Sequence, residues 1–179
     1  MKRKLLSLLL AAFLLFQQTA FADTFIVTSN ADSGPGTLRE AIAMASNNGT
    51  ALMDFINFNL TDLSEAGRTI ILHSPLTLTS RITIDASLQP GNKFGVSDSR
   101  IKIVHDGTSN FSQGLILPGV EAIELYGLYF SDFLFGDPNP TEIRCVIYIP
   151  GFVRNIKIGA SGKGNVFYRN AMSIANRYS

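Results

Sequence analysis

A single short amphipathic helix, placed ahead of a long series of short strands, is the feature that most constrains the fold of this chain. Four apolar residues recur at the i, i+3, i+4 and i+7 positions of a helix and form one stripe: Leu38, Ala41, Ile42 and Ala45. Thr37 and Glu40 have the spacing of a capping box, and the Gly-Pro-Gly segment 34–36 predicts a turn just before them. Asn47-Asn48-Gly49 predicts a left-handed end to the helix.

The rest of the chain shows almost no other helical pattern. After Gly49 it breaks into short apolar segments, separated by turns rich in Gly, Asn, Asp and Ser. The expected strands cover residues 53–58, 69–72, 76–78, 82–84, 101–104, 115–117, 123–125, 146–149, 156–158 and 166–167. A β-solenoid needs a cover over its first coil, because that coil would otherwise expose a sheet edge and the core. We therefore expect the helix to be that cover.

One tripeptide recurs with two apolar residues around a polar one: Ile82-Thr83-Ile84, Ile101-Lys102-Ile103, Ile123-Glu124-Leu125 and Ile156-Lys157-Ile158. Alternation along a strand predicts that the apolar pair faces inward and the middle residue faces water. The apolar segment 115–117 corresponds to segment 146–148 one repeat later, and Ile123 corresponds to Ile156. The two sequence intervals both fall within the range of repeat lengths found in repeat architectures. An antiparallel sandwich also has short strands, but it needs tight hairpins, and Asp106-Gly107 is the only good hairpin signal between strands.

The N-terminus has the pattern of a secretory signal peptide. Lys2-Arg3-Lys4 form a basic start, residues 5–16 are apolar except for Ser7, and Ala20-Phe21-Ala22 provide small residues for cleavage. The apolar run is shorter than the roughly 20 residues of a membrane-spanning helix. We expect cleavage after Ala22, a secreted or cell-surface location, and a mature chain that does not span a membrane.

Without the leader, the chain has 12 Lys and Arg against 14 Asp and Glu, a net charge of −2 with no charged run. This balance offers no basis for nucleic acid as a partner. Cys145 is the single cysteine and lies in an apolar strand, so we expect a buried thiol. His73 and His105 have no flanking metal-ligand pattern, and both are taken as ordinary polar positions.

Several segments resemble a known family. Residues 27–42 resemble the N-terminal motif of bacterial secreted right-handed parallel β-helix proteins, which have the pectin-lyase-like fold. The resemblance continues in Ile56-Asn57-Phe58 and in residues 82–91, where the family often has an Ile-Asp-Gly-Thr-x-Gln-Pro-Gly-like turn and this chain has Ala86-Ser87 for Gly-Thr. Residues 124–128 and 164–167 are similar to its coil pieces. The resemblance implies an all-β right-handed parallel β-helix with one N-terminal capping helix, and export. It does not imply one activity.

These observations predict a signal peptide over residues 1–22, an N-terminal cap of a strand plus the helix over 23–49, and parallel coils over 50–179. No capping pattern follows the last apolar piece, residues 172–175. We therefore expect either the front part of a longer protein, a degraded gene fragment, or a chain whose open last coil associates with another molecule, such as a second copy.

Two groups of side chains are candidate sites. Arg100 and Lys102 fall on one face of a strand. This stretch locally resembles pectin-degrading enzymes, in which cations so placed hold a uronate carboxylate. Those enzymes also need clustered aspartates to bind calcium or to serve as an acid–base pair, and Asp85, Asp98 and Asp106 are too scattered for either. A solvated strand face explains the two cations better. The second group consists of closely spaced aromatic residues that could stack on sugars, although aromatic strand residues are more often core: Tyr126, Tyr129, Phe130, Phe133 and Phe135.

We therefore expect an adhesin-like surface module that binds glycans or proteins without catalysis, through one coil face and the loop 132–144. Tyr129 and Phe133 are the residues to replace in a test of that loop. No residue is assigned as catalytic, cofactor-binding or metal-binding, and no cofactor is expected. The alternative is the N-terminal scaffold of a polysaccharide lyase or hydrolase whose catalytic coils follow Ser179.

Overall fold

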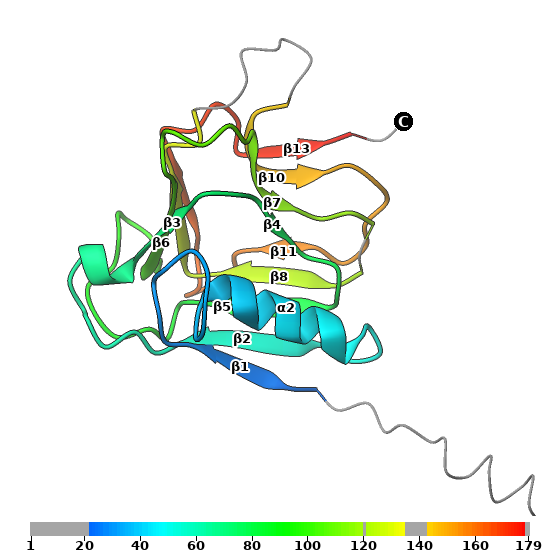
Figure 1. Ribbon diagram of the computed structural model, residues 1–179, viewed down its shortest axis with the longest axis horizontal. Coiled ribbons are helices and arrows are strands. Elements are labelled where there is room, and N and C mark those ends of the chain that lie inside the picture. Colours follow the sequence, from blue (N-terminus) through cyan, green and yellow to red (C-terminus); the bar gives the residue numbers. More distant parts are fainter. Residues whose placement is uncertain (1–21, 120, 135–142, 178–179) are drawn as a thin grey trace, which may run out of the picture.

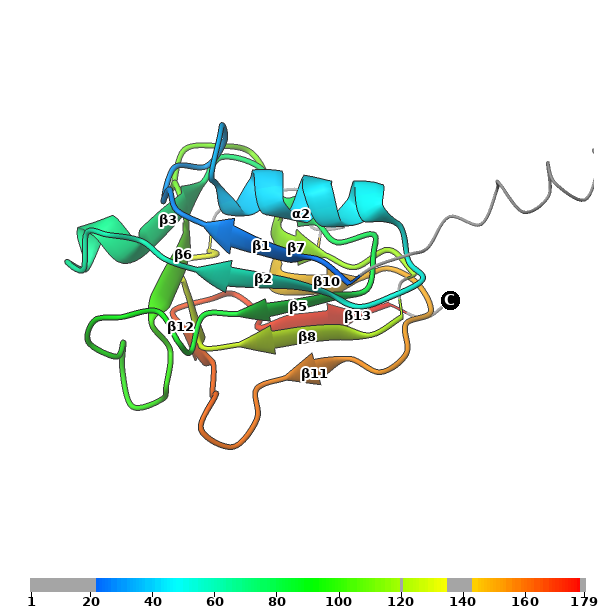
Figure 2. The same cartoon turned by 90° about the horizontal axis from the view of Figure 1, so that it is seen from below.

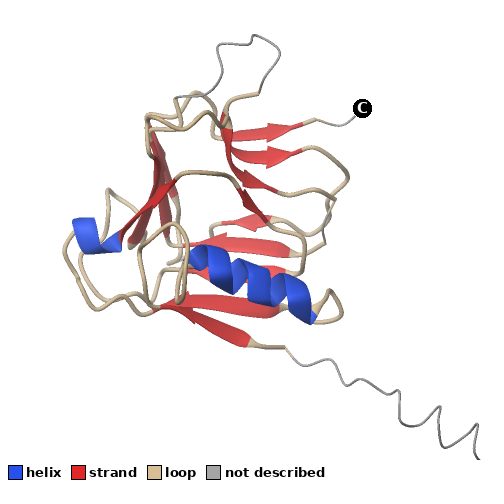
Figure 3. Ribbon diagram, viewed as in Figure 1, coloured by secondary structure: helices blue, strands red, loops and turns tan. Residues whose placement is uncertain are grey.

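The computed structural model describes residues 22–119, 121–134 and 143–177, which wind through three parallel β-sheets (Figures 1 and 3). The predicted leader lies outside the described residues, apart from Ala22. Each named strand pairs in parallel with a strand one coil away, including β1 with β2 and β10 with β13. The antiparallel sandwich is therefore excluded for this part of the chain, and the arrangement is consistent with a parallel β-solenoid.

From β2 onward, successive strands visit the three sheets in turn. The first sheet contains β1 (Thr24–Val27), β2 (Asp54–Phe58), β5 (Ile82–Asp85), β8 (Ile123–Tyr126) and β11 (Lys157–Ile158). The second sheet contains β3 (Thr69–Leu72), β6 (Ile101–His105), β9 (Leu128–Ser131) and β12 (Val166–Tyr168). The third contains β4 (Leu76–Thr77), β7 (Gln113–Ile116), β10 (Cys145–Ile149) and β13 (Ile174–Asn176). Most of the expected strands are present with slightly shifted ends.

The coils differ in length, so intervals along the sequence do not repeat. In the first sheet Ile56 pairs with Ile84, and Ile84 pairs with Leu125 after a much longer interval. The predicted interval from Ile123 to Ile156 is confirmed, because Glu124 pairs with Lys157 at the same separation. The predicted match of segment 115–117 with 146–148 is wrong by a single position, because Leu115 pairs with Ile147 rather than with Val146.

Inward-facing apolar side chains stack from coil to coil and form one core. In the second sheet, Ile70, Ile103, Phe130 and Phe167 follow one another in register, and the rings of Phe130 and Phe167 are stacked at 5.2 Å between centroids. The tripeptide prediction needs one correction. Thr83 is buried although it faces outward, because Glu124 of the next coil covers it and accepts a hydrogen bond from its hydroxyl at 3.3 Å.

Helix α2 (Leu38–Asn48) covers one end of the stack (Figure 2). The predicted apolar stripe of Leu38, Ala41, Ile42 and Ala45 is buried against β1, β2 and β4. Thr37 caps the helix by accepting the N–H of Glu40 at 3.3 Å, as predicted. The return bond differs, because the Glu40 carboxylate accepts the N–H of Gly36 at 2.6 Å rather than that of Thr37. Gly49 ends the helix with φ of +90°.

A one-turn 3-10 helix, η1 (Ala66–Arg68), lies between β2 and β3. Among the described residues, no helix is both long and apolar enough to cross a membrane.

Candidate functional site

An open pocket of about 930 Å³ lies over the start of the second sheet, at its β3 edge. This volume is in the range of sites that hold small ligands. The loop after β1, the segment around η1, strand β3 and Lys102 of β6 surround it. Its lining residues are Asn30, Ala31, Asp32, Ser33, Glu65, Ala66, Thr69, Ile71, His73 and Lys102.

Strand alternation supplies the floor of the pocket. Ile70 and Leu72 face the core, so Thr69, Ile71 and His73 face outward. Asn30 fastens the overlying loop to this strand, because its side-chain amide donates to the carbonyl of Ala66 at 3.0 Å and to that of Thr69 at 3.1 Å. The wall and the floor are therefore held together by bonds from a side chain to the backbone.

An arginine network holds the other side of the loop. Arg39 of α2 forms an ion pair with Asp32 at 2.6 Å and also donates to the backbone carbonyl of Asp32. The same guanidinium donates to the carbonyls of Ser74 at 2.9 Å and Pro75 at 2.8 Å. One side chain of the capping helix thus connects the loop after β1 to the corner between β3 and β4.

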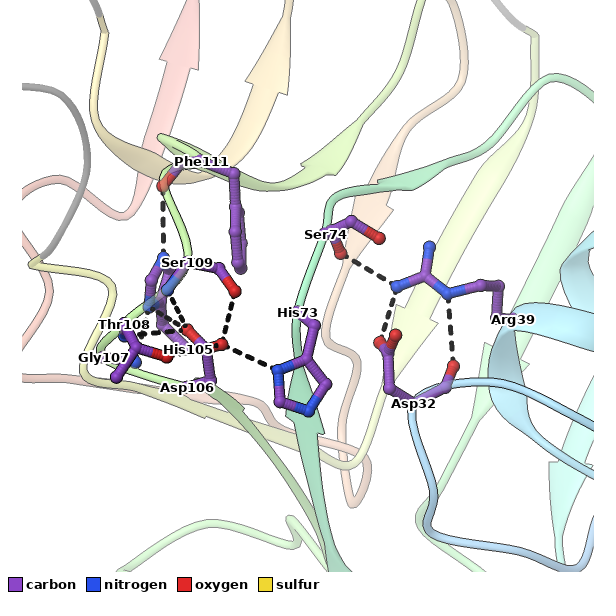
Figure 4. Close-up of polar contacts among 10 residues, drawn as sticks. All are labelled: Asp32, Arg39, His73, Ser74, His105, Asp106, Gly107, Thr108, Ser109 and Phe111. Carbon is purple, nitrogen blue, oxygen red and sulfur yellow. Dashed lines mark hydrogen bonds and ion pairs between the residues drawn. The ribbon is translucent and has the colours of Figure 1, made fainter.

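His73, which lines the pocket, forms a pair with Asp106 (Figure 4). The two residues are 33 positions apart and lie side by side because Leu72 pairs with His105 in the β3–β6 ladder. His73 Nδ1 is 2.7 Å from Asp106 Oδ2. The His73 side chain is 61% exposed whereas that of Asp106 is 5% exposed, so a buried carboxylate orients an accessible ring.

Asp106 is fixed as a carboxylate by the turn that follows it. Its oxygens accept the N–H groups of Thr108 at 3.0 Å and Ser109 at 2.8 Å, and the hydroxyls of the same two residues. Burial alone would raise the pKa of Asp106, but the bonds from Ser109, His73 and Thr108 outweigh it and hold this pKa well below its usual range. An ionised Asp106 requires a proton on His73 Nδ1, which leaves Nε2 as the nitrogen that is not used by this bond.

His105 has a different role, although its Nδ1 lies 3.3 Å from Asp106 Oδ1. Its Nδ1 accepts the N–H of Gly107 at 2.8 Å, and its Nε2 lies 3.2 Å from the carbonyl of Phe111. These two bonds require a neutral ring with the proton on Nε2, so the contact with Asp106 is not an ion pair. The buried ring stacks on Phe111 at 4.0 Å between centroids and belongs to the core.

The outer face of the second sheet continues from the pocket toward the later coils. Lys102 forms an ion pair with Glu65 at 3.0 Å, and its ammonium lies 5.5 Å from the centre of the Tyr129 ring. Tyr129 in turn lies between Phe94, at 6.1 Å, and Tyr168, at 6.3 Å between ring centroids. The pocket therefore opens onto an aromatic surface made by neighbouring coils.

Most of the closely spaced aromatic residues that the structure describes belong to the core, which is the more common role of aromatic strand residues. Tyr126, Phe130 and Phe133 are buried, and only Tyr129 is half-exposed on the outer face. Phe135 and most of the loop 132–144 lie outside the described residues. Leu128-Tyr129-Phe130-Ser131 is a strand, and its alternation places Tyr129 and Phe130 on opposite faces.

The Arg100 and Lys102 side chains do not form an anion site. Lys102 pairs with Glu65, while Arg100 donates to the carbonyl of Gly91 and forms no ion pair with a described residue. The three scattered aspartates are separate in space as well: Asp85 pairs with Lys163, Asp98 with Lys93, and Asp106 with His73. Over the described ranges, no group of three or more His, Cys, Asp or Glu side chains is placed to hold a metal ion.

Cys145 is a buried free thiol, as predicted. Burial raises its pKa to about 11, which keeps it protonated and unreactive at neutral pH.

The chain matches no family model and no curated protein sequence. Function is therefore inferred from the fold and from the geometry of this pocket. The sequence did not indicate Asn30, Asp32, Glu65 or the pairing of His73 with Asp106. The separation of the last two equals the interval from Ile123 to Ile156, but coil lengths differ along the chain, so this interval alone does not identify the pair.

Proposed function

We propose that this protein is a secreted or cell-surface binding module with a right-handed, pectin-lyase-like parallel β-helix fold, and that it binds glycans on the outer face of its second sheet. The observation that carries the proposal is the pocket under the loop after β1, next to outward-facing tyrosines of later coils. Sugars combine hydroxyls, which need hydrogen-bonding side chains, with flat C–H faces, which stack on aromatic rings. This face offers both.

The resemblance of residues 27–42 to exported bacterial β-helix proteins, together with the leader, supports the surface location. Intact mass of the native protein from the cells and their medium tests this part. We expect an N-terminus at Asp23, in the medium or on the cell surface. A protein recovered inside the cells with residues 1–22 still attached would contradict the location.

Glycan binding is tested on a sugar array and then by calorimetry with the mature protein. Tyr129→Ala and Tyr168→Ala should each weaken the binding of an array hit by about two- to tenfold, because stacking on one ring is worth about 0.5–1.5 kcal/mol. Tyr148→Ala is the matched control, since Tyr148 is a half-buried tyrosine on β10 of the third sheet. An array without hits, or an equal loss with Tyr148→Ala, would refute the proposal.

Phe133→Ala is not a suitable test of binding, because this ring is 1% exposed. Its removal creates a core cavity, and a loss of binding would then report a loss of stability.

A second candidate is a polysaccharide-active enzyme in which this chain itself provides the base, which differs from the expected scaffold whose catalytic coils follow Ser179. The His73–Asp106 pair favours it, because a carboxylate-oriented imidazole that faces an open pocket is the arrangement of a general base. Release of sugar fragments from a polysaccharide panel by the wild type, and its loss in His73→Gln, would establish this candidate. Binding without any fragment release would leave the binding module as the function.

A further inference from the structure

We infer that the pocket under the loop after β1 binds a non-acidic sugar and excludes uronate and sulfated sugars. This inference rests on the proposed glycan-binding function and names the class of ligand at the same site.

The cations around the pocket are already neutralised. Lys102 is paired with Glu65, and Arg39 is paired with Asp32 while it also donates to three backbone carbonyls. A ligand carboxylate would therefore have to displace a protein carboxylate from its partner. Such an exchange gives up one ion pair for another and provides no net attraction.

The local charge also opposes an anion. Three carboxylates lie in or directly under the pocket, those of Asp32, Glu65 and Asp106, against the two cations Lys102 and Arg39. Among these Asp, Glu, Lys and Arg side chains, the carboxylates outnumber the cations by one. An incoming acidic sugar meets repulsion that is only partly screened by salt, because Asp32 and Asp106 are largely buried.

The pocket is rich in hydrogen-bond acceptors and poor in free donors. The Asn30 amide hydrogens are used on Ala66 and Thr69, and the Thr69 hydroxyl donates to the carbonyl of Glu65 at 2.7 Å. With its Nδ1 bonded to Asp106, His73 presents Nε2 away from that carboxylate, where this nitrogen accepts a hydrogen bond whenever it carries no proton (Figure 4). Sugar hydroxyls donate to such acceptors, and the exposed Ile71 between Thr69 and His73 offers an apolar surface to the ring.

The test compares matched linear tetrasaccharides of galactose and of galacturonic acid, titrated into the mature protein. We expect the galactose form to bind about tenfold more tightly. Glu65→Gln removes one negative charge and releases Lys102, so it should raise the affinity for the galacturonate form by about fivefold. Glu121→Gln is the matched control, because this similarly exposed carboxylate pairs with Arg154 outside the pocket and its loss should leave both affinities unchanged.

His73 supplies the second arm. His73→Ala should weaken binding of the galactose form by about fivefold, and His73→Gln should lose less because its amide oxygen still accepts a hydrogen bond. Equal or tighter binding of the galacturonate form to the wild type would overturn the inference while the glycan-binding proposal stands. An array on which no sugar binds would instead remove the proposed function itself.

Discussion

Replacement of Gln89 by leucine should lower the free energy of unfolding by about 2–4 kcal/mol. Gln89 is 1% exposed and follows β5, and its amide bonds to the backbone of Leu60 in the preceding coil. The Leu60 N–H donates to Gln89 Oε1 at 2.9 Å, and Gln89 Nε2 donates to the Leu60 carbonyl at 3.0 Å. One side chain thus satisfies both polar backbone groups of a residue that is itself buried.

The magnitude follows from what the substitution leaves behind. Leucine is close to glutamine in volume, so the cavity is small, but both backbone groups of Leu60 lose their partner. Each buried group without a partner costs about 1–3 kcal/mol, and burial of the new apolar side chain offsets a part of this sum. The expected loss of about 2–4 kcal/mol is a large share of the free energy of unfolding of a typical domain, which is roughly 5–15 kcal/mol.

Urea unfolding of the mature protein, followed by circular dichroism, measures the effect. Gln113→Leu is the control, because Gln113 is only half-buried and donates one bond, to the carbonyl of Ile143 at 2.7 Å. We expect a loss of about 1 kcal/mol there. Equal losses in the two variants would show that the Leu60 groups find other partners, and the reasoning about a bridging amide would be refuted.

Three further predictions concern single residues. Gly127→Ala should lower the free energy of unfolding by about 2–4 kcal/mol in the same assay, because the new Cβ would lie 2.3 Å from the backbone nitrogen of Ser87. Gly162 also has a positive φ but has open space around it, so Gly162→Ala should cost about 1–2 kcal/mol, and equal costs would contradict the close approach. Cys145, with a pKa of about 11, should react with a thiol reagent near pH 8 only after unfolding, and fast labelling of the native protein would show that the thiol is accessible. The difference in free energy of unfolding between wild type and Asp106→Asn should be constant near pH 5 and shrink as the pH falls below about 3.8. The reason is that a carboxylate whose pKa is depressed in the folded state stabilises the fold fully only above its pKa in the unfolded chain. A difference unchanged near pH 2 would contradict this.

The local features of the fold were predictable from the sequence. The stripe and cap of α2 depend on residues within a few helical turns, and the strands depend on alternation over a few positions. Strand β9 was not predicted, because only Gly127 separates it from β8 and the two strands read as one segment. The same glycine, with φ of +67°, lets the chain turn from the first sheet into the second at a single position.

The candidate site was not predictable, because it depends on which coils lie next to each other. Coil lengths differ even within the first sheet, where Ile84 lies much closer in the sequence to its partner Ile56 than to its partner Leu125. An interval in the sequence therefore does not say which outward-facing residues are neighbours, and His73 and Asp106 read as unrelated polar residues. Alternation also says which side of a strand a residue faces, but not whether the next coil covers it, as Glu124 covers Thr83.

The stacking rule of this fold explains why a site forms on the outer face of the second sheet. Inward positions must be apolar in each coil to continue the core, so only outward positions and corners are free to carry polar or aromatic side chains. Parallel register then aligns the outward residues of successive coils in one row, at a spacing of about 4.8 Å: Thr69, Lys102, Tyr129 and Val166. Such a row begins at the pocket and runs along the stack. A linear ligand can follow it from coil to coil, whereas a compact ligand would contact the pocket alone, so affinity that rises with the length of a sugar chain is the behaviour that this geometry requires.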